Sequence, residues 1–275
     1  MNNIIPKIVG SYLNVLSYFS ADYAANKALH LFSTPRKGFL NEKQHTFLNT
    51  ATQKLLYYDD LPIMTYHWKG NNKTLLLVHG WESNSARWKK KIKPFLDAGF
   101  NIVALDAPAH GASGSKVFNA LLYSEFINVV VKKHNPEIII GHSVGGMSSV
   151  FFQQKYQHKS IEKIVLLGSP SEFKDILKRY IEMLGYNKKI ESQLNTVIFD
   201  QFGAHPEAFS TAKFIKSISS QSLIIHDTKD TIIPFSDAEL ISKNHKNSYL
   251  ISTTGLGHSL NDKSVTKSIL DFINS

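Results

Sequence analysis

The chain lacks cysteine altogether: none occurs among its 275 residues. This absence excludes disulfide bonds, thiolate ligands for a metal ion and a cysteine nucleophile. Long apolar runs are also missing, because none reaches the roughly 18 residues that a membrane-spanning helix needs. With 43% hydrophobic and 19% charged residues, the composition is that of an ordinary folded protein. Its length suffices for one large domain or two small ones.

Acidic residues are in the minority: 22 Asp and Glu stand against 31 Lys and Arg, for a formal net charge of +9. The densest basic stretch, RWKKKIKPF at 87–95, favours a helix with Trp88, Ile92 and Phe95 facing inward and its lysines in water. Charge alone would also permit attraction to anionic membranes or nucleic acid. No nucleic-acid-binding motif accompanies the charge, so we expect no nucleic-acid partner.

The N-terminal segment 1–32 has neither an uninterrupted apolar centre nor a small-residue cleavage site. It lacks the features of an export signal, and we expect a cytoplasmic protein. Tyr12, Leu16, Phe19 and Tyr23 recur at intervals typical of an amphipathic helix. Such a helix would pack on the core. Two alternatives stay open: a peripheral contact with a membrane or with a lipid-like substrate, and a cleaved export signal.

Short apolar runs alternate with helical patterns from about residue 63 onward. The runs are IMTYHW (63–68), TLLLVHG (74–80), NIVALDAP (101–108), EIIIGHS (137–143), KIVLLGSP (163–170), SLIIHD (222–227) and SYLIST (248–253). Continuous apolar strands separated by helices indicate a mostly parallel sheet with helices on both faces. In such sheets the chemistry lies at the carboxyl ends of the strands, and these ends are rich in His, Asp, Ser and Gly.

We predict a single domain over residues 1–275, in which residues 1 to about 60 form a helical lead-in. The alternation of strands and helices breaks between about 171 and 221, where helical patterns follow one another. This stretch is too short, and too dependent on the main body, to be a separate domain. We therefore expect it to be an inserted helical cap.

A serine lies between glycines where the run at 138–142 ends, in Gly141-His142-Ser143-Val144-Gly145. A G-x-S-x-G motif between a strand and a helix holds its serine on a sharp, strained turn, and glycines two positions away avoid clashes there. The turn lifts the hydroxyl clear of the sheet, and the N-terminus of the following helix favours developing negative charge. We therefore predict that Ser143 is a nucleophile.

A serine hydroxyl needs a base to take its proton, and in this arrangement the chain order is serine, acid, histidine. We choose His258, which lies in the glycine-rich stretch TTGLGHSL after the last strand. The other histidines after Ser143 are expected in other roles: His226 in a structural position at a strand end, His205 in the cap, and His158 and His245 at exposed helix ends.

The acid must orient the imidazole and stabilise its charged form. Asp227 and Asp230 both lie in HDTKDTIIP at 226–234. We choose Asp230, which stands in the loop before the closing IIP. Asp227, directly after the strand, Asp200 in the cap and Asp237 on the next helix are the alternatives.

An oxyanion needs two fixed N–H donors. We predict the backbone amide of Val144, which follows the nucleophile, and that of Trp81, in the loop after LLLVHG. The Trp81 indole would either line the substrate pocket or simply pack. His79 would brace this loop by hydrogen bonding rather than act in catalysis.

The segments LLLVHGW, ALDAPAHGASG, IIIGHSVGG, IIHDTKDTIIP and GLGHS, in this order, resemble the α/β-hydrolase superfamily from about residue 63 to the C-terminus. DAPAHGASG is similar to the family's D-x-P-G-x-G-x-S segment, with Ala109 where glycine is commoner, and Asp106 would brace loops near the site. The layout is most similar to esterases, including monoacylglycerol-lipase-like and lysophospholipase-like members. A serine at position 143 argues against epoxide hydrolases and dehalogenases, which use an aspartate there.

The resemblance implies the α/β-hydrolase fold and a serine hydrolase that cleaves carboxylic esters through an acyl-enzyme on Ser143, with Asp230 and His258 completing the triad. Neither a metal ion nor an organic cofactor is expected. A thioesterase, amidase or peptidase with the same triad, or a non-catalytic hydrolase-like binding protein, are the alternatives. A small-molecule ester with an apolar acyl group would suit the apolar cap residues, although packing within the cap also explains them: Phe173, Tyr180, Leu184, Phe199, Phe202 and Phe209.

Overall fold

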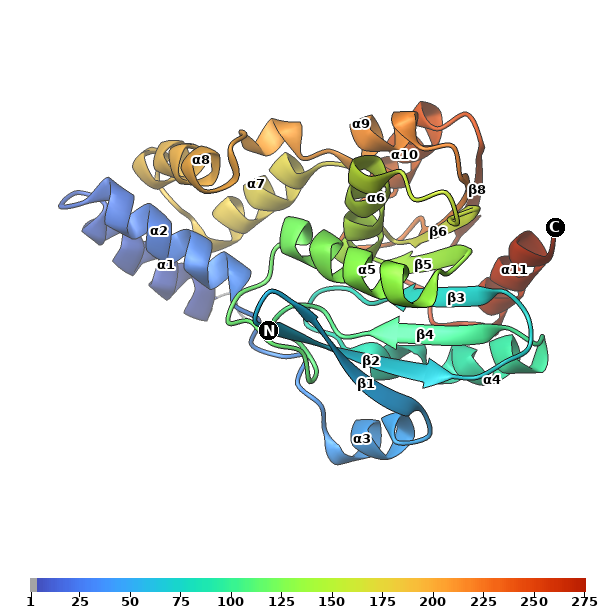
Figure 1. Ribbon diagram of the computed structural model, residues 1–275. Coiled ribbons are helices and arrows are strands. Elements are labelled where there is room, and N and C mark those ends of the chain that lie inside the picture. The colour runs from blue at the N-terminus through green and yellow to red at the C-terminus, as the bar shows by residue number, and fades with distance from the viewer. Residues whose placement is uncertain (1–3) are drawn as a thin grey trace. The chain divides into compact units, whose positions relative to one another are not determined.

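The computed structural model of the chain describes residues 4–275 (Figure 1). Over the described residues the chain divides into two compact units. We call them the helical unit, made of Met1–Thr34 and Glu172–Ser210, and the sheet unit, made of Pro35–Ser171 and Thr211–Ser275. Between residues 4 and 275, no helix is both long and apolar enough to cross a membrane.

The sheet unit contains one mostly parallel sheet. Within the described residues it has eight strands in the order β1-β2-β4-β3-β5-β6-β7-β8. β2 pairs antiparallel with β1 and with β4, and the other neighbours run parallel. All seven runs predicted as strands form β2 to β8. The bounds are β1 Thr52–Tyr58, β2 Leu61–Trp68, β3 Thr74–Val78, β4 Asn101–Leu105, β5 Ile138–His142, β6 Lys163–Leu167, β7 Gln221–Asp227 and β8 Ser248–Thr253.

Helices cover both faces of this sheet. The helices of the unit are α3 Glu42–Leu48, α4 Lys89–Asp97, α5 Ala120–His134, α6 Val144–Tyr156, α9 Thr211–Phe214, α10 Phe235–Asn244 and α11 Lys263–Asn274, with 3-10 turns Ser85–Trp88 and Ile215–Ser217. Alternate residues of β3 point to opposite faces. Leu76 and Val78 join a core with α5 and α6, whereas Leu75 and Leu77 join a core with α4 and α11. Each such buried side chain contributes about 2 kcal/mol by leaving water.

The first strand corrects the predicted lead-in of helices over residues 1–60. Residues 52–58 form β1, an edge strand that reverses into β2 through a tight turn in which Asp59 has a positive φ of 48°. Most of its side chains are exposed, so TQKLLYY lacks the apolar run that reveals a buried strand. Pairing with β2, rather than burial, holds this segment extended.

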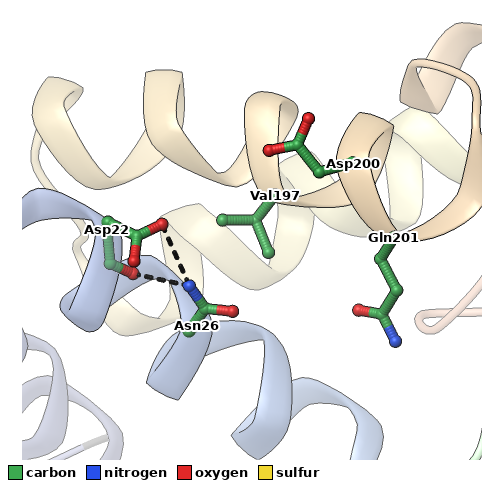
Figure 2. A pocket seen from close by; sticks show the side chains of 5 residues that line it. All are labelled: Asp22, Asn26, Val197, Asp200 and Gln201. Carbon is green, nitrogen blue, oxygen red and sulfur yellow. Dashed lines mark hydrogen bonds between the residues drawn. The ribbon is translucent and has the colours of Figure 1, made fainter.

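The helical unit joins the N-terminal helices to the cap helices. Its elements are α1 Ile4–Leu16, α2 Ala21–Ser33, α7 Phe173–Leu184 and α8 Lys188–Phe202, with a 3-10 turn at Pro206–Ala208. Ala24, Ala25 and Ala28 of α2 are buried against apolar residues of α7 and α8, in one core. Small side chains let α2 approach α8 closely, and Figure 2 shows the residues of both helices that line an open pocket there: Asp22, Asn26, Val197, Asp200 and Gln201.

We predicted one amphipathic N-terminal helix that packs its apolar stripe on the core, and this prediction is wrong. The helix breaks after Leu16, and the Ser20 side chain caps α2 by accepting from the Tyr23 amide at 3.2 Å. Tyr12, Phe19 and Tyr23 are exposed, and Leu13 is buried in their place. The apolar spacing of this segment therefore marks an outward face.

The cap segment leaves and re-enters the sheet unit at one place. The Ala212 amide donates to the Ser171 carbonyl at 3.3 Å, so the two ends of the excursion 172–210 lie side by side. Residues 211–221, which we predicted as part of the cap, belong to the sheet unit, where Ala212 and Ile215 are buried in its core. Most of the cap's predicted apolar residues pack within the helical unit: Tyr180 and Leu184 are buried, Phe173, Phe202 and Phe209 lie against the same core, and Phe199 is half exposed.

Candidate active site

Ser143 stands on the turn between β5 and α6 in a strained conformation. Its φ is 54° and its ψ is −129°, a combination that costs about 1–3 kcal/mol outside glycine. The surroundings require glycine on both sides. A Cβ atom on Gly141 would lie 2.5 Å from the Gly146 Cα, and one on Gly145 would lie 2.3 Å from the His79 oxygen. The Ser143 amide donates to the Leu167 carbonyl of β6 at 2.8 Å, which anchors the turn to the sheet.

A continuous hydrogen-bond chain joins the three residues that the sequence suggested as a triad. The His258 Nε2 atom lies 3.0 Å from the Ser143 Oγ, and its Nδ1 atom lies 2.7 Å from Asp230 Oδ2. The Asp230 side chain is fully buried. Nδ1–H therefore donates to the carboxylate, which leaves Nε2 free to accept the hydroxyl proton of Ser143.

Backbone amides fix the Asp230 carboxylate. Its Oδ1 atom accepts from the amides of Ile232 at 2.8 Å and Ile233 at 3.1 Å. The buried His226 places its Nε2 atom 3.3 Å from Oδ2 and 2.9 Å from the Ile233 carbonyl, so it holds the same loop. The segment IIP after the acid thus supplies amide donors.

The alternative acids have other partners. Asp227 accepts from Thr253 Oγ1 at 2.8 Å and from the amides of Leu256 at 2.9 Å and Gly255 at 3.2 Å. Burial alone would raise the pKa of Asp227, but these hydrogen bonds outweigh it and lower the pKa to about 2. Asp227 is therefore an anion that holds the stretch before His258. Asp237 accepts from the Ser171 amide and hydroxyl, and Asp200 lies on α8 of the helical unit.

The loop after β3 lies directly against the nucleophile. A Cβ atom on Gly80 would lie 2.9 Å from the Ser143 Cβ, so no other residue fits without a shift. Trp81 follows Gly80 in the chain, and Val144 follows Ser143. Within residues 4–275, neither the Trp81 nor the Val144 amide donates to another protein group. The Trp81 indole packs edge-on against His110 and Phe118, 5.3 and 5.4 Å between ring centres.

His79 braces this loop through both ring nitrogens. Nδ1–H donates to the Gly80 carbonyl at 2.8 Å, and Nε2 accepts from the Ala107 amide at 2.9 Å. Burial, and then the neighbouring His110, lower the pKa of His79 to about 3. The ring is therefore neutral, and it ties the end of β3 to the end of β4.

The chain is similar to known proteins in sequence and in fold. The family described as the alpha/beta hydrolase fold matches residues 73–184. A bifunctional esterase/perhydrolase of Acinetobacter calcoaceticus is 25% identical, over 78% of this chain and 93% of its own length. Two solved structures are similar in fold. An esterase from Exiguobacterium antarcticum has a TM-score of 0.63 at 16% identity, covering 82% of this chain and 100% of that one. A bromoperoxidase from Bacillus anthracis has a TM-score of 0.64 at 18% identity, covering the same shares.

The match over residues 73–184, the sequence relatives and the fold together support assignment of this chain to the α/β-hydrolase superfamily. Its predicted fold class, a mostly parallel sheet with helices on both faces, is confirmed, and the chain is a hydrolase. The narrower similarity to monoacylglycerol-lipase-like or lysophospholipase-like members stays a prediction.

Three further side chains of the hydrolase hold the loop that follows its candidate base. Each donates to one of three successive backbone carbonyls. His142 Nε2 donates to the carbonyl of His258 at 2.8 Å, Arg87 Nη2 to that of Ser259 at 2.6 Å, and Lys91 Nζ to that of Leu260 at 3.5 Å. Sequence reasoning assigned none of these roles. It placed the basic residues of 87–95 in water, yet Lys91 is buried, and burial lowers its pKa to about 8. The available signal was the spacing of Arg87 and Lys91, one helical turn apart.

The electrostatics favour a neutral His258. Burial lowers the pKa of this imidazole, and the hydrogen bond and charge of Asp230 oppose that effect. Arg87 and His226 lower the His258 pKa further. Burial also lowers the pKa of the adjacent His142 well below its usual value, so His142 is neutral and donates through Nε2–H. The candidate base is thus free to accept a proton at neutral pH.

The remaining polar residues of the prediction have structural partners. Asp106 accepts from the Tyr66 hydroxyl at 2.9 Å and from the Ser85 amide at 2.8 Å, as expected for a loop brace.

His245 corrects our expectation of an exposed position: it is buried, with Nδ1 3.0 Å from the Ser222 hydroxyl. The other two histidines lie away from regular strands: His158 lies 2.8 Å from the Ser160 hydroxyl, and His205 stacks on Phe199. Among the described residues no group of three or more His, Asp or Glu could hold a metal ion.

Proposed function

We propose that this hydrolase cleaves carboxylic esters through an acyl-enzyme on Ser143. The hydrogen-bond chain from Asp230 through His258 to the Ser143 hydroxyl, at 2.7 and 3.0 Å, is the observation that carries the proposal. This chain supplies a nucleophile, a base that takes its proton and an anion that orients the base. Similarity to an esterase/perhydrolase supports the choice of ester over other acyl compounds.

Acylation begins when the Ser143 oxygen attacks the ester carbonyl and His258 Nε2 takes the hydroxyl proton. The carbonyl oxygen becomes an oxyanion, for which the amides of Val144 and Trp81 are the proposed donors. The tetrahedral intermediate collapses, the bond to the alcohol oxygen breaks, and His258 gives its proton to the leaving alcohol. Asp230 stabilises the imidazolium throughout.

Deacylation repeats these steps with water in place of the alcohol. His258 takes a proton from water as the water oxygen attacks the acyl carbon, and it returns the proton to Ser143 as the acid leaves. His258 carries each proton that is transferred, and no step calls for a metal ion or an organic cofactor. We propose a small ester with an apolar acyl group as the substrate, and a cytoplasmic location stays a prediction.

The test is hydrolysis of p-nitrophenyl esters, from acetate to palmitate, combined with labelling by a fluorophosphonate probe. Wild type, Ser143→Ala and the exposed-site control Ser217→Ala would be compared. We expect turnover and labelling in wild type and Ser217→Ala, and neither in Ser143→Ala. Labelling without ester turnover would transfer the proposal to thioesters or amides. A folded wild type that shows neither would overturn the triad and favour a binding protein.

A further inference from the structure

The first helix of the helical unit turns its apolar side outward. Ile5, Ile8, Tyr12 and Val15 are 60–71% exposed, and they follow one another at steps of three and four along α1. These steps place them on one side of the helix. An ordinary surface helix buries such a stripe. We call these four residues, with Tyr18 and Phe19 of the following turn, the α1 face.

The opposite side of α1 is held in place by close and polar contacts within the same unit. A Cβ atom on Gly10 would overlap the Leu184 carbonyl, so glycine lets α1 cross the end of α7 at very short range. Asn14 Nδ2 donates to the Gly185 carbonyl at 2.8 Å, and Asn14 Oδ1 accepts from the Asn187 amide at 2.8 Å. The outward direction of the apolar stripe is thus fixed by specific partners.

Aromatic rings and lysines continue the α1 face at the turn into α2. Tyr18 is 70% exposed and Phe19 is 85% exposed. The Lys189 ammonium lies 4.3 Å from the Tyr18 ring centre, and the Lys27 ammonium lies 5.4 Å from the ring centre of the exposed Tyr23. Residues 4–21 contain Lys7 and no acidic residue. Lysines therefore stand beside the aromatic end of the face, together with the acidic Asp22 at the start of α2.

We propose that the α1 face docks on an anionic phospholipid surface. Aromatic rings with lysines beside them suit the boundary between headgroups and acyl chains, and the lysines attract anionic lipid. A helix with one strongly apolar side lies flat in that boundary. The same spacing could form a coiled-coil seam with a second copy, but that needs about three heptads, and α1 has 13 residues. The proposal is independent of the reaction at Ser143, because binding is scored without substrate.

The first experiment is co-sedimentation of the full chain with vesicles of phosphatidylcholine mixed with phosphatidylglycerol, and with phosphatidylcholine alone. The test variant carries Ile8→Ser, Tyr12→Ser and Phe19→Ser. The matched control carries Leu55→Ser, Tyr57→Ser and Tyr249→Ser, at three exposed apolar positions of the sheet unit. We expect the test variant to lose at least about tenfold in affinity for the mixed vesicles, and the control to change less than about twofold. Lys27→Gln with Lys189→Gln should weaken binding by about fivefold per lysine.

A second measurement uses the absence of native cysteine. A polarity-sensitive fluorophore on Phe19→Cys should shift to shorter wavelength when mixed vesicles are added, and the same dye on Tyr249→Cys should not. Circular dichroism melts would establish that all variants fold. No sedimentation of folded wild type, equal loss in test and control variants, or an unchanged Phe19→Cys signal would each overturn the proposal. A wild-type dimer that the test variant converts to monomer would assign the face to a second copy instead.

Discussion

The Nη2 atom of Arg87 lies 2.6 Å from the backbone oxygen of Ser259, the residue after His258. The His142 imidazole donates to the oxygen of His258 itself at 2.8 Å. Side chains from two separate elements therefore hold two successive carbonyls of one loop. The position of the His258 ring depends on these contacts as well as on Asp230, and supporting contacts of this kind are what keep a catalytic group aligned.

Replacing Arg87 should change the pH dependence of ester hydrolysis. The guanidinium contributes to the lowered pKa of His258, so Arg87→Met should raise that pKa. The proposed base would work in its neutral form, and the acidic limb of kcat/KM should therefore move to higher pH. Arg87→Lys keeps a cation and should leave the limb closer to wild type. A pH profile that is the same in Arg87→Met and wild type would contradict this electrostatic role.

His142 should affect turnover more than binding. His142→Ala removes the donor to the His258 carbonyl, and one lost hydrogen bond of about 1–1.5 kcal/mol corresponds to roughly tenfold in kcat. His142→Gln can place an amide N–H near the position of Nε2 and should recover part of the loss. Steady-state kinetics would separate kcat from KM. Equal losses in both variants, or a loss confined to KM, would argue against a positioning role.

The two aspartates that follow β7 should separate catalysis from stability. Asp230→Asn should lower kcat by about 10⁴-fold, because the imidazole loses its orienting anion. Asp227→Asn should act mainly on stability. Its hydrogen bonds to the end of β8 and to the loop after β8 would be weaker, which should lower the free energy of unfolding by about 2 kcal/mol. Urea titrations and kinetics on both variants would check the contrast, and a reversed pattern would exchange the two assignments.

Acid should remove the contribution of Asp227 over a defined range. Its pKa falls from 3.8 to about 2 on folding, because hydrogen bonds outweigh the effect of burial. The stabilisation is therefore complete above pH 3.8 and is lost as the pH falls through about 2. Between these limits the unfolding free energy of wild type should fall more steeply than that of Asp227→Asn. Parallel curves would show that the carboxylate does not titrate as described.

Ala109 stands in a conformation that suits glycine. Its φ is 61°, which costs an alanine about 1–2 kcal/mol. Ala109→Gly should therefore stabilise the protein by about 1 kcal/mol after the extra entropy of glycine is subtracted. The control Ala208→Gly lies in the turn Pro206–Ala208, where φ is not positive, and it should destabilise by about 0.5 kcal/mol. Thermal melts would show opposite shifts, and shifts of the same sign would contradict the strain argument.

The sequence predicts elements whose signal is local. The run at 138–142, followed by a serine between glycines, predicts both β5 and the turn at Ser143, because the motif and the conformation lie in the same few residues. The triad could be proposed for the same reason, since each member follows a strand end. β1 could not be predicted, because its extended form comes from pairing with β2 and not from its own apolar pattern.

The sequence does not determine whether a given side of a helix faces the core or the solvent. The apolar spacing of α1 predicts a helix, but a side that faces water has the same periodicity as a side that faces a core. Its outward direction depends on Gly10 and Asn14 meeting residues about 170 positions later, such as Gly185. Lys91 is the reverse case, a cation expected in water that is buried because the Leu260 carbonyl and the Thr266 hydroxyl lie within reach.

Ser171 and Ala212 lie side by side at the two ends of the excursion 172–210, so the segment between them could be removed or replaced at this point. Because these residues are already joined by a hydrogen bond, a short link between them would close the sheet unit without the excursion 172–210. The core of that excursion is shared with α2, so residues 4–34 would have to be removed with it. A change at this point would therefore add or remove two segments together, 4–34 and 172–210. Ser143, Asp230 and His258 all lie outside these two segments.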